Sequence, residues 1–334
     1  MLAAISHGNQ GLYRFLRVVS RLGVFGIIYL MESPKILLYY KYIHIERPKD
    51  VMIQQRAVCG DLGLTGRILV AQEGINGTVE GSAQAVAKYM DFMDKHPLFG
   101  GIKFKQSQGT GSAFSKLKVK VRSEIVTSEL GADDVNPNVV TGKYLSAEQL
   151  HEWFEQGKNF KIVDMRNEYE HIAGHFEGSV LPAMTNFRDL KKAVENIKDL
   201  KEEVVVTVCT GGVRCEKASG YLVTQGFKDV YQLEDGIVSY MEKYPNKHFK
   251  GKLYVFDNRM LMAFETDSPE HELVGRCIKC QIPSERFTNC SLIDCHKQII
   301  CCENCLEDNK IFCTPQCKET YKQNERVQTQ VMAI

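Results

Sequence analysis

Cysteine is concentrated in one short stretch near the end of this 334-residue chain. Nine of the twelve cysteines lie between residues 277 and 317. Eight of these nine form four closely spaced pairs, and Cys301 is left over. The pairs are Cys277 and Cys280, Cys290 and Cys295, Cys302 and Cys305, and Cys313 and Cys317. Eight thiolates suffice for two zinc ions with four cysteine ligands each. Because so short a stretch buries little apolar core, we expect the metal to fold it.

The spacing of the pairs does not show which two pairs bind the same metal ion. Adjacent pairs or alternate pairs would serve equally, and His296 is a possible substitute ligand. Disulfides, free thiols and an iron–sulfur cluster are the alternatives to zinc. A secreted disulfide protein would be short and would spread its cysteines along the chain. One dense block in a long chain favours a reduced cytoplasmic protein with a structural metal module.

The overall composition is that of a soluble globular protein with two or three domains. Hydrophobic residues make up 44% of the chain, charged residues 25%, and the net charge is +1. Any site for a polyanion must therefore come from local clustering of basic residues. Residues 1–30 contain three arginines and no acidic residue, and their apolar run from Leu22 to Leu30 is too short to cross a membrane. We expect a disordered leader or a true start at Met31, and no membrane association.

Residues 31–130 are predicted to form a ferredoxin-like domain. Strands are predicted over 35–45, 101–107 and 116–127, and helices over 49–63 and 82–96. A hairpin over 66–81 is predicted to turn at the Gly-Ile-Asn-Gly of residues 74–77. The resulting order β-α-β-β-α-β places both helices on one face of the sheet and leaves the other face free.

Basic residues alternate with apolar ones along the last of these strands. Lys116, Lys118, Lys120 and Arg122 share one side of the strand, because strand side chains alternate between faces. Lys103 and Lys105 follow the same pattern in the preceding strand, and no acidic residue accompanies the six. A solvated polar face is the ordinary meaning of such a pattern. The imbalance of charge equally supports an anion-binding surface, with RNA as the partner.

The remaining chain divides into five predicted parts. Residues 131–145 are a linker, 146–250 an α/β domain, 251–275 a connecting segment, 276–320 the cysteine-rich zinc module and 321–334 a tail. In the α/β domain uniformly apolar strands alternate with helices, which predicts a parallel sheet covered on both faces. Ligands bind such sheets at the carboxyl ends of the strands. Cys209 stands at the end of the strand 202–208.

The loop after this strand, "CTGGVRC", has the composition of an anion cradle. Gly211 and Gly212 allow the backbone to curl so that successive N–H groups point inward. The following helix N-terminus and Arg214 add positive charge, which lowers the pKa of a thiol. We expect Cys209 to be a nucleophilic thiolate held by Thr210, Gly211, Gly212 and Val213. An inert buried cysteine is the alternative, and Cys215 is either a resolving cysteine or a packing residue.

The loop "VCTGGVRCEKAS" resembles the active loop of rhodanese domains, in which a cysteine carries a persulfide. The stretches "DMRNEYEHIAGHFEGSV" (164–180) and "GFKDVYQLEDGI" resemble two further rhodanese motifs. Asp235 stands where the last motif usually has glycine, and aspartate tolerates the left-handed conformation better than most residues. Four residues separate Cys209 from Arg214, as in rhodaneses, whereas phosphatases with a related cradle have five. The spacing favours sulfur or a small electrophile over phosphoryl transfer.

A wider set of motifs resembles the bacterial tRNA uridine hydroxylases that contain a rhodanese domain. The set comprises "YYKYIHI", "EGINGTVEG", "KLKVKVRSEIV", the cysteine loop, "KGKLYVFDNRM" and the cysteine-rich stretch. The resemblance implies hydroxylation of the wobble uridine of tRNA at C5, with molecular oxygen as co-substrate and Cys209 as the catalytic cysteine. It implies the tRNA anticodon region as partner. The sequence contains no flavin or haem motif, so the electron donor stays open.

Several chemical roles are compatible with these residues. Cys209 would add to the uracil ring as a thiolate, or act as a persulfide or sulfenic acid. Arg214 would stabilise a developing enolate or bind a phosphate. Tyr39, Tyr40 and Tyr42 are candidate aromatic surfaces for a base splayed out of its stack, with at least one of them in the core. A sulfurtransferase with a Cys209 persulfide and a non-catalytic zinc and RNA-binding scaffold are the competing functions.

Overall fold

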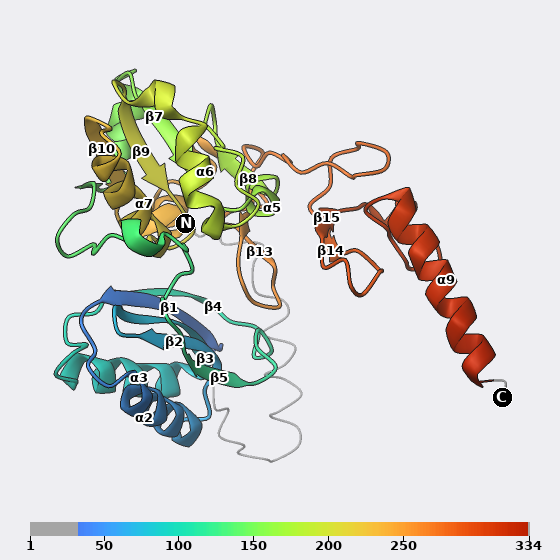
Figure 1. Ribbon diagram of the computed structural model, residues 1–334, viewed down its shortest axis with the longest axis horizontal. Helices are drawn as coiled ribbons and strands as arrows, with labels where there is room; N and C mark the ends of the chain where they lie inside the picture. The colour runs from blue at the N-terminus through green and yellow to red at the C-terminus, as the bar shows by residue number, and fades with distance from the viewer. Residues whose placement is uncertain (1–32, 333–334) are drawn as a thin grey trace, which may run out of the picture. The chain divides into compact units, whose positions relative to one another are not determined.

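The computed structural model describes residues 33–332 (Figure 1). The predicted leader, residues 1–30, lies outside the described part. The first domain contains five strands and two helices. These are β1 (Lys35–Tyr42), α2 (Pro48–Asp61), β2 (Thr65–Ala71), β3 (Gly74–Gly81), α3 (Ala83–Lys95), β4 (Phe104–Gln108) and β5 (Leu117–Val121). Ser82 caps α3 by accepting a hydrogen bond from the backbone N–H of Ala85 at 3.2 Å.

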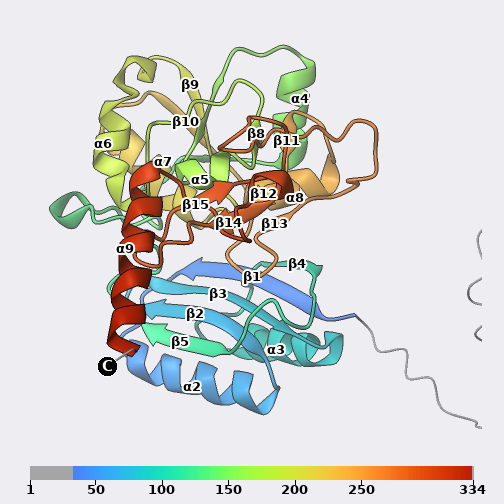
Figure 2. The same cartoon turned by 90° about the vertical axis from the view of Figure 1, so that its right-hand side faces the viewer.

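The five strands form one sheet in the order β4-β1-β3-β2-β5. The first four strands have the ferredoxin-like arrangement, and β5 adds to the edge as a parallel partner of β2. Helices α2 and α3 cover one face (Figure 2), where Leu37, Tyr39 and Val119 are buried in the domain core. The opposite face carries no helix of this domain. The predicted fold and its free face are therefore confirmed.

The hairpin between β2 and β3 differs from the prediction. The strands pair from Ala71 with Gly74, so the turn is Gln72–Glu73, and the Gly-Ile-Asn-Gly segment lies inside β3. The structure gives a different reason for one of these glycines. A β-carbon at Gly77 would lie 2.3 Å from the ring of Tyr39 on the neighbouring strand β1. Gly77 therefore makes room for a core tyrosine instead of forming a turn.

The α/β domain has a four-stranded parallel sheet in the order β6-β10-β9-β7. Its strands are β6 (Lys143–Leu145), β7 (Lys161–Asp164), β9 (Val204–Val208) and β10 (Asp229–Leu233), and a further short strand is β8 (Gly174–Phe176). Its helices are α4 (Ala147–Glu155), α5 (Glu168–His171), α6 (Leu190–Glu195), α7 (Val213–Thr224) and α8 (Gly236–Lys243). The parallel sheet was predicted, but β6 was not. It occupies the end of the expected linker, because residues 143–145 pair with β10.

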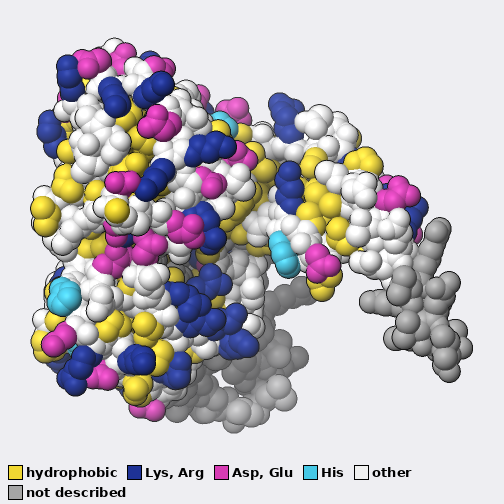
Figure 3. All heavy atoms as spheres, viewed as in Figure 1, with side chains coloured by type: hydrophobic (Ala, Val, Ile, Leu, Met, Phe, Trp, Pro, Cys, Tyr) yellow, Lys and Arg dark blue, Asp and Glu magenta, His cyan; other side chains and the backbone are white. Residues whose placement is uncertain are grey.

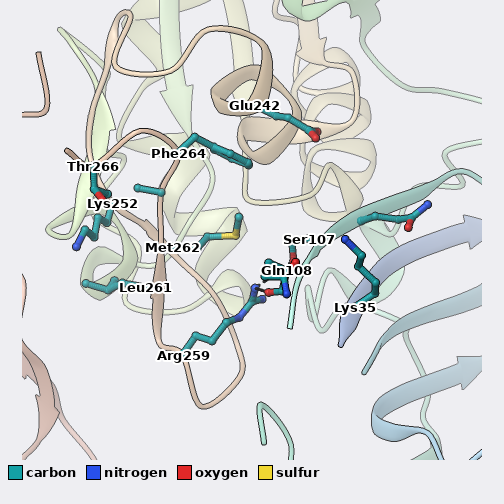
Figure 4. A pocket seen from close by; sticks show the side chains of 12 residues that line it. Lys35, Ser107, Gln108, Glu242, Lys252, Arg259, Leu261, Met262, Phe264 and Thr266 are labelled. Atoms are coloured by element: carbon teal, nitrogen blue, oxygen red, sulfur yellow. Dashed lines mark hydrogen bonds between the residues drawn. The ribbon is translucent and has the colours of Figure 1, made fainter. Parts of the chain in front are cut away.

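The expected connecting segment is structured and ties the two domains together. Strand β11 (Phe249–Gly251) pairs with β8, and β12 (Leu253–Tyr254) forms a hairpin with β13 (Leu261–Met262). At the hairpin tip, Arg259 donates to the hydroxyl of Ser107 at 3.1 Å and to the carbonyl of Gln108 at 3.0 Å. Figure 4 shows Arg259 reaching these residues beside a hollow of about 580 Å³.

The cysteine-rich part contains little regular structure. It has a hairpin of β14 (Phe287–Asn289) and β15 (Gln298–Ile300), followed by helix α9 (Pro315–Met332) (Figure 1). Its hydrophobic core consists of a few side chains, Ile299 and Ile311 among them, surrounded by cysteines. So small a core fits the expectation that metal binding stabilises this module. Within residues 33–332, no helix has the length and hydropathy to cross a membrane.

Candidate active site

Cys209 follows the last residue of β9, at the carboxyl edge of the parallel sheet. The Cys209 loop (residues 209–214) curls back and leads into α7. Gly212 has φ 98°, a conformation that favours glycine, and its N–H donates to Sγ of Cys209 at 3.2 Å. The carbonyls of Cys209 and Thr210 accept hydrogen bonds from Ile237 and Val238 at the start of α8. The loop is therefore held from both sides.

The Asp235–Gly236 turn supports the same loop. Asp235 has φ 62°, the left-handed conformation expected for it. Gly236 lies so close to the loop that a β-carbon there would be 2.7 Å from the backbone of Gly211 and Gly212. The close approach requires glycine at position 236, and Asp235 accommodates the left-handed turn that produces it.

The environment of Cys209 favours its thiolate. Burial opposes ionisation, but a hydrogen bond from the Cys215 thiol, the charge of Arg214 and the nearby backbone N–H groups outweigh it and lower the pKa of Cys209 to about 6. Burial and the proximity of Cys209 raise the pKa of Cys215 well above its ordinary value. At neutral pH the pair therefore consists of a Cys209 thiolate and a protonated Cys215.

Arg214 is engaged by a residue that the sequence analysis did not single out. Its two terminal nitrogens donate to the two carboxylate oxygens of Glu170 at 2.6 and 2.9 Å. Glu170 is completely buried, and the Thr210 hydroxyl lies 3.2 Å from the guanidinium. Such bidentate pairs are geometrically fixed. Arg214 therefore orders the loop in this structure, and an enolate or phosphate would have to share it with Glu170. The buried carboxylate is four residues from Arg166, within a stretch that the sequence analysis quoted only for its resemblance.

The helix-free face of the ferredoxin-like sheet covers the Cys209 loop. A β-carbon at Gly211 would lie 2.6 Å from Leu38, and one at Gly212 would lie 2.8 Å from the hydroxyl of Tyr40. Tyr40 donates to Glu216 at 3.0 Å, and Tyr42 donates to the carbonyl of Val213 at 3.1 Å. Strand β1 thus forms a roof over the loop, and Cys209 is completely buried beneath it.

The three tyrosines of β1 have separate roles. Tyr39 is fully buried in the core of its own domain, with its hydroxyl 2.5 Å from that of Tyr89. This matches the expectation that at least one of them packs in the core. Tyr40 and Tyr42 bind helix α7 through their hydroxyls. Neither Tyr40 nor Tyr42 was expected to join the two domains, because their partners lie more than 170 positions away in the sequence.

A buried lysine joins the same two domains. The side chain of Lys217, on α7, is fully buried, and its Nζ lies 2.8 Å from Glu73, 3.2 Å from Glu124 and 2.8 Å from Asp134. Burial lowers the pKa of this lysine, but hydrogen bonds to Asp134 and Glu73 outweigh that effect and raise it. The lysine is therefore charged and fixes α7 to the β2–β3 turn and to the segment after β5.

A cleft of about 520 Å³ lies between the helix-free sheet face and the Cys209 loop. Leu38, Asn76 and Arg67 line it from the sheet, and Thr210, Gly211 and Arg214 from the loop. Asn167, Asn186, Phe114, Phe187 and Phe256 also belong to its lining. The sulfur of Cys209 is not part of this surface, since it lies under the loop backbone. The sheet face and the Cys209 loop nevertheless meet at this cleft. The sequence alone did not show how these two regions come together.

Basic side chains extend from this cleft. Lys116, Lys118, Lys120 and Arg122 are exposed along β5, and Arg67 of β2 stands opposite Lys118. Figure 3 shows Lys and Arg side chains gathered over this domain. A second hollow, of about 560 Å³, shares Arg67, Phe114 and Phe256 with the cleft and includes Lys116 and Lys118. We name the four residues Lys116, Lys118, Lys120 and Arg122, which lie on β5 and at its two ends, the basic stripe.

Lys103 and Lys105 do not belong to this surface, contrary to expectation. Strand β4 lies at the opposite edge of the sheet from β5. The Nζ of Lys103 is 2.5 Å from Glu234, and that of Lys105 is 3.0 Å from Asp235. The acidic partners of these lysines are not close in the sequence, because Glu234 and Asp235 come from the other domain. Their charges are used in the interface between the domains.

The cysteines of the C-terminal module form two groups of four. One group contains Cys277, Cys280, Cys302 and Cys305, and the other contains Cys290, Cys295, Cys313 and Cys317. Alternate pairs therefore share a site. Neighbouring sulfurs are 3.5 to 3.6 Å apart, too far for a disulfide and close to the roughly 3.8 Å separation in a tetrahedral zinc–thiolate site. Cys301 and His296 belong to neither group. The donor sets fit two metal ions.

Comparisons with known proteins agree with this architecture. Residues 34–125 match the family described as UPF0176 acylphosphatase like domain, residues 146–243 the rhodanese-like domain and residues 250–318 the rhodanase C-terminal domain. In solved structures, the rhodanese-like domain of an Anabaena protein is 19% identical, with a TM-score of 0.29, over 33% of this chain and 80% of that one.

Two curated relatives match nearly the whole chain. A tRNA uridine(34) hydroxylase of Bacillus cytotoxicus is 40% identical over 90% of this chain and 94% of its own length. A tRNA uridine(34) hydroxylase of Bacillus licheniformis is 42% identical over 85% of this chain and 88% of its own length. The likeness spans both domains, the Cys209 loop and the cysteine-rich module. The chain therefore belongs to the tRNA uridine(34) hydroxylase family.

Proposed function

We propose that this protein hydroxylates uridine 34 of tRNA at C5, with molecular oxygen as co-substrate. The observation that carries the proposal is the cleft between the basic sheet face and the Cys209 loop. It is bordered by aromatic side chains and by a loop that holds an ionised cysteine. A wobble base splayed out of its stack would enter this cleft while the phosphates of the anticodon loop lie along the basic stripe.

In this proposal Cys209 acts as a nucleophile on the pyrimidine. Addition of the thiolate to C6 of uracil forms a sulfur–carbon bond, breaks the C5–C6 π bond and moves electron density to C5, where the oxygen atom is introduced. Loss of the C5 hydrogen as a proton and expulsion of the thiolate from C6 then restore the double bond and free Cys209. The protonated Cys215 thiol donates a hydrogen bond to Cys209 and so stabilises the thiolate, whose own proton has been lost to solvent. Hydroxylation by oxygen also consumes two electrons, which an external two-electron reductant must supply.

Access to the sulfur is part of the proposal. Leu38 and Tyr40 cover the loop, and Cys209 has no exposed surface. The thiolate therefore reaches a base only when the β1 roof and the loop move apart locally. This burial does not favour a sulfurtransferase that exchanges sulfur with small acceptors in solution.

The two cysteine groups would each hold one structural zinc ion. Each supplies four sulfur ligands, which completes a tetrahedral zinc site and leaves no position open for catalysis. We therefore assign zinc to the folding of the C-terminal module and not to the hydroxylation step. Free thiol ligands persist in a reducing compartment, and tRNA is found in the cytoplasm. We therefore propose that the protein acts in the bacterial cytoplasm.

Nucleoside analysis of tRNA tests the proposal. A deletion strain in which no second route to the modification is active should lack 5-hydroxyuridine and its derivatives at position 34. The wild-type gene should restore them, and Cys209→Ala should not. Unchanged 5-hydroxyuridine in the deletion strain would overturn the proposal. Full complementation by Cys209→Ala would leave only a scaffold role. Rapid sulfur transfer from thiosulfate to cyanide, lost in Cys209→Ala, would support a sulfurtransferase instead.

Binding measurements test the role of the basic stripe. Lys116→Glu, Lys118→Glu and Lys120→Glu together should weaken tRNA binding and reduce its salt dependence, since each lost phosphate contact lowers the logarithmic slope by roughly 0.7 for single-stranded RNA. A matched control changes Lys49, Lys88 and Lys95 to Glu, because these lysines lie on the helices of the opposite face. Equal effects of the two triple variants would show that only net charge matters.

A further inference from the structure

One wall of the cleft contains a buried amide oxygen without a partner. Asn167 lines the cleft and is only 8% exposed. Its Nδ2 donates to the hydroxyl of Tyr169 at 2.7 Å, whereas its Oδ1 is buried and accepts no hydrogen bond. Asn167 and Glu170 are arranged as a capping box at the start of α5, in which the N–H of Asn167 donates to the Glu170 carboxylate at 3.0 Å. The N–H of Glu170 donates to the backbone carbonyl of Asn167 at 2.9 Å and makes no hydrogen bond to Oδ1. The side-chain oxygen is left over.

An unsatisfied buried acceptor costs free energy unless a ligand or water supplies a donor. The neighbouring groups do not supply one. The Arg214 guanidinium donates to Glu170 and Thr210, and the Thr210 hydroxyl donates to Glu170. Two other amides line the cleft. Asn76 donates through its Nδ2 to the carbonyl of Ile125 at 2.9 Å. Asn186 uses its Oδ1 to accept from the N–H of Arg188. Within the described residues, Asn167 is therefore the cleft residue whose buried side-chain acceptor has no partner, and a base N–H reaches this oxygen only when the side chains that cover it move.

A second side chain of the cleft points to a flat ligand. Phe256 is 47% exposed, although it is a large apolar residue. Its ring lies 5.7 Å from the guanidinium carbon of Arg214 and 5.2 Å from the ring of Tyr254. Exposed aromatic rings in basic grooves are the usual stacking surfaces for unpaired bases. The cleft thus combines a stacking surface with a single buried acceptor.

We propose that Asn167 is the residue that selects uracil in this cleft, by accepting the N3–H of the base while Phe256 stacks against the ring. This inference rests on the proposed function and assigns the recognition of its substrate. Uracil carries a hydrogen at N3, whereas N3 of cytosine is an acceptor. A cytosine in the same position would set two lone pairs against each other, and the buried oxygen of Asn167 would stay unpaired. Such mismatches discriminate strongly between otherwise similar substrates.

The test compares anticodon stem-loops that carry uridine, 3-methyluridine or cytidine at position 34. The methyl group replaces the N3 donor and leaves both carbonyl groups of the base in place. The wild-type protein should bind the uridine RNA about tenfold or more tightly than the other two, in line with the cost of an unpaired buried acceptor. Asn167→Ala should bind all three RNAs with similar affinity. Asn167→Asp keeps an acceptor and should keep the preference for uridine.

Two further variants separate recognition from general binding. Asn196→Ala changes an asparagine of the same domain that does not line the cleft and should keep the wild-type preference. Phe256→Ala should weaken binding of all three RNAs by about tenfold without changing their ratio. A thermal melt of each variant shows whether it is folded, and the ratio between RNAs is measured within one variant.

The possible failures are distinguishable. Equal binding of uridine and 3-methyluridine by the wild-type protein, or an unchanged ratio in Asn167→Ala, would overturn the role of Asn167. Nucleoside analysis would still show wobble hydroxylation in that case. If instead the deletion strain retained 5-hydroxyuridine, the proposed function would fail, and the binding ratios would describe recognition without that reaction.

Discussion

Leu38 of β1 lies directly over Gly211 of the Cys209 loop, so that a β-carbon on the glycine would be 2.6 Å from the leucine Cδ2. Leu38 belongs to the ferredoxin-like domain by sequence, yet it packs against the hydrophobic core of the α/β domain. The contact requires glycine on one side and an apolar residue on the other. Through this contact the ferredoxin-like domain covers Cys209, the most reactive group of the α/β domain.

Truncation of this leucine should expose Cys209. Leu38→Ala removes apolar contact worth about 1–2 kcal/mol from the roof, which lowers the cost of local opening by that amount. We expect iodoacetamide to alkylate Cys209 about tenfold faster than in the wild-type protein. The rate is measured by mass spectrometry of the peptide that contains Cys209. Leu69→Ala is the control, since it lies on the same sheet face but two strands from β1. Equal rates in Leu38→Ala and the wild type would show that β1 does not limit access.

The acidity of Cys209 predicts a characteristic pH profile. Because its pKa is lowered to about 6, the thiolate fraction should rise through pH 6 and be nearly complete by pH 8. The alkylation rate of Cys209 should therefore level off above about pH 7. A cysteine with the ordinary pKa of 9.0 would continue to gain reactivity up to pH 9 and beyond.

The same profile identifies the cause of the shift. Cys215→Ala removes the hydrogen bond from the Cys215 thiol and should move the midpoint for Cys209 to higher pH. Cys59→Ala, which changes a buried cysteine in the other domain, should leave the midpoint in place. A midpoint near 9 in the wild-type protein would contradict the thiolate assignment.

Features fixed by short stretches of sequence were predictable. The apolar strand that ends at Val208, the glycines after Cys209 and the start of α7 follow from hydrophobic pattern and turn chemistry. Asp235 adopts the left-handed conformation expected from its side chain. The eight clustered cysteines indicated two metal sites because ligand number and pairing are local properties. The order of strands and helices in the ferredoxin-like domain followed in the same way.

Features that depend on contacts between distant segments were not predictable. The acids beside Lys103 and Lys105 come from a turn about 130 positions later, and Glu170 meets Arg214 across 44 positions. Spacing could not show that alternate cysteine pairs combine. The glycine-rich segment of β3 suggested a turn because local reasoning cannot see the Tyr39 ring that requires Gly77. Nor did the sequence indicate that Asn167 would keep a free acceptor.

Lys217 should be a major source of interdomain stability. Lys217→Met keeps the apolar stem but leaves Glu73, Glu124 and Asp134 without their shared cation. We expect the free energy of unfolding to fall by about 2–3 kcal/mol in urea denaturation, below the range for completely buried pairs because these carboxylates keep part of their hydration.

An exposed ion pair provides the control for Lys217. Lys191→Met breaks the pair between Lys191 and Asp133, both of which are about half exposed. Such pairs contribute at most about 1 kcal/mol, so this variant should unfold close to the wild type. Similar losses in the two variants would mean that burial of Lys217 adds nothing to stability.

The interleaved cysteine groups predict how metal is lost. Cys302→Ser removes one ligand of the group with Cys277, Cys280 and Cys305, so purified protein should contain about one zinc ion instead of two. Cys301→Ser is the matched control, because Cys301 is adjacent and buried but belongs to neither group. It should retain both ions. The Cys302→Ser protein should also show earlier proteolysis of the C-terminal module if, as proposed above, bound metal stabilises its small core. Loss of metal from Cys301→Ser, or two ions in Cys302→Ser, would contradict the assignment of ligands to the two sites.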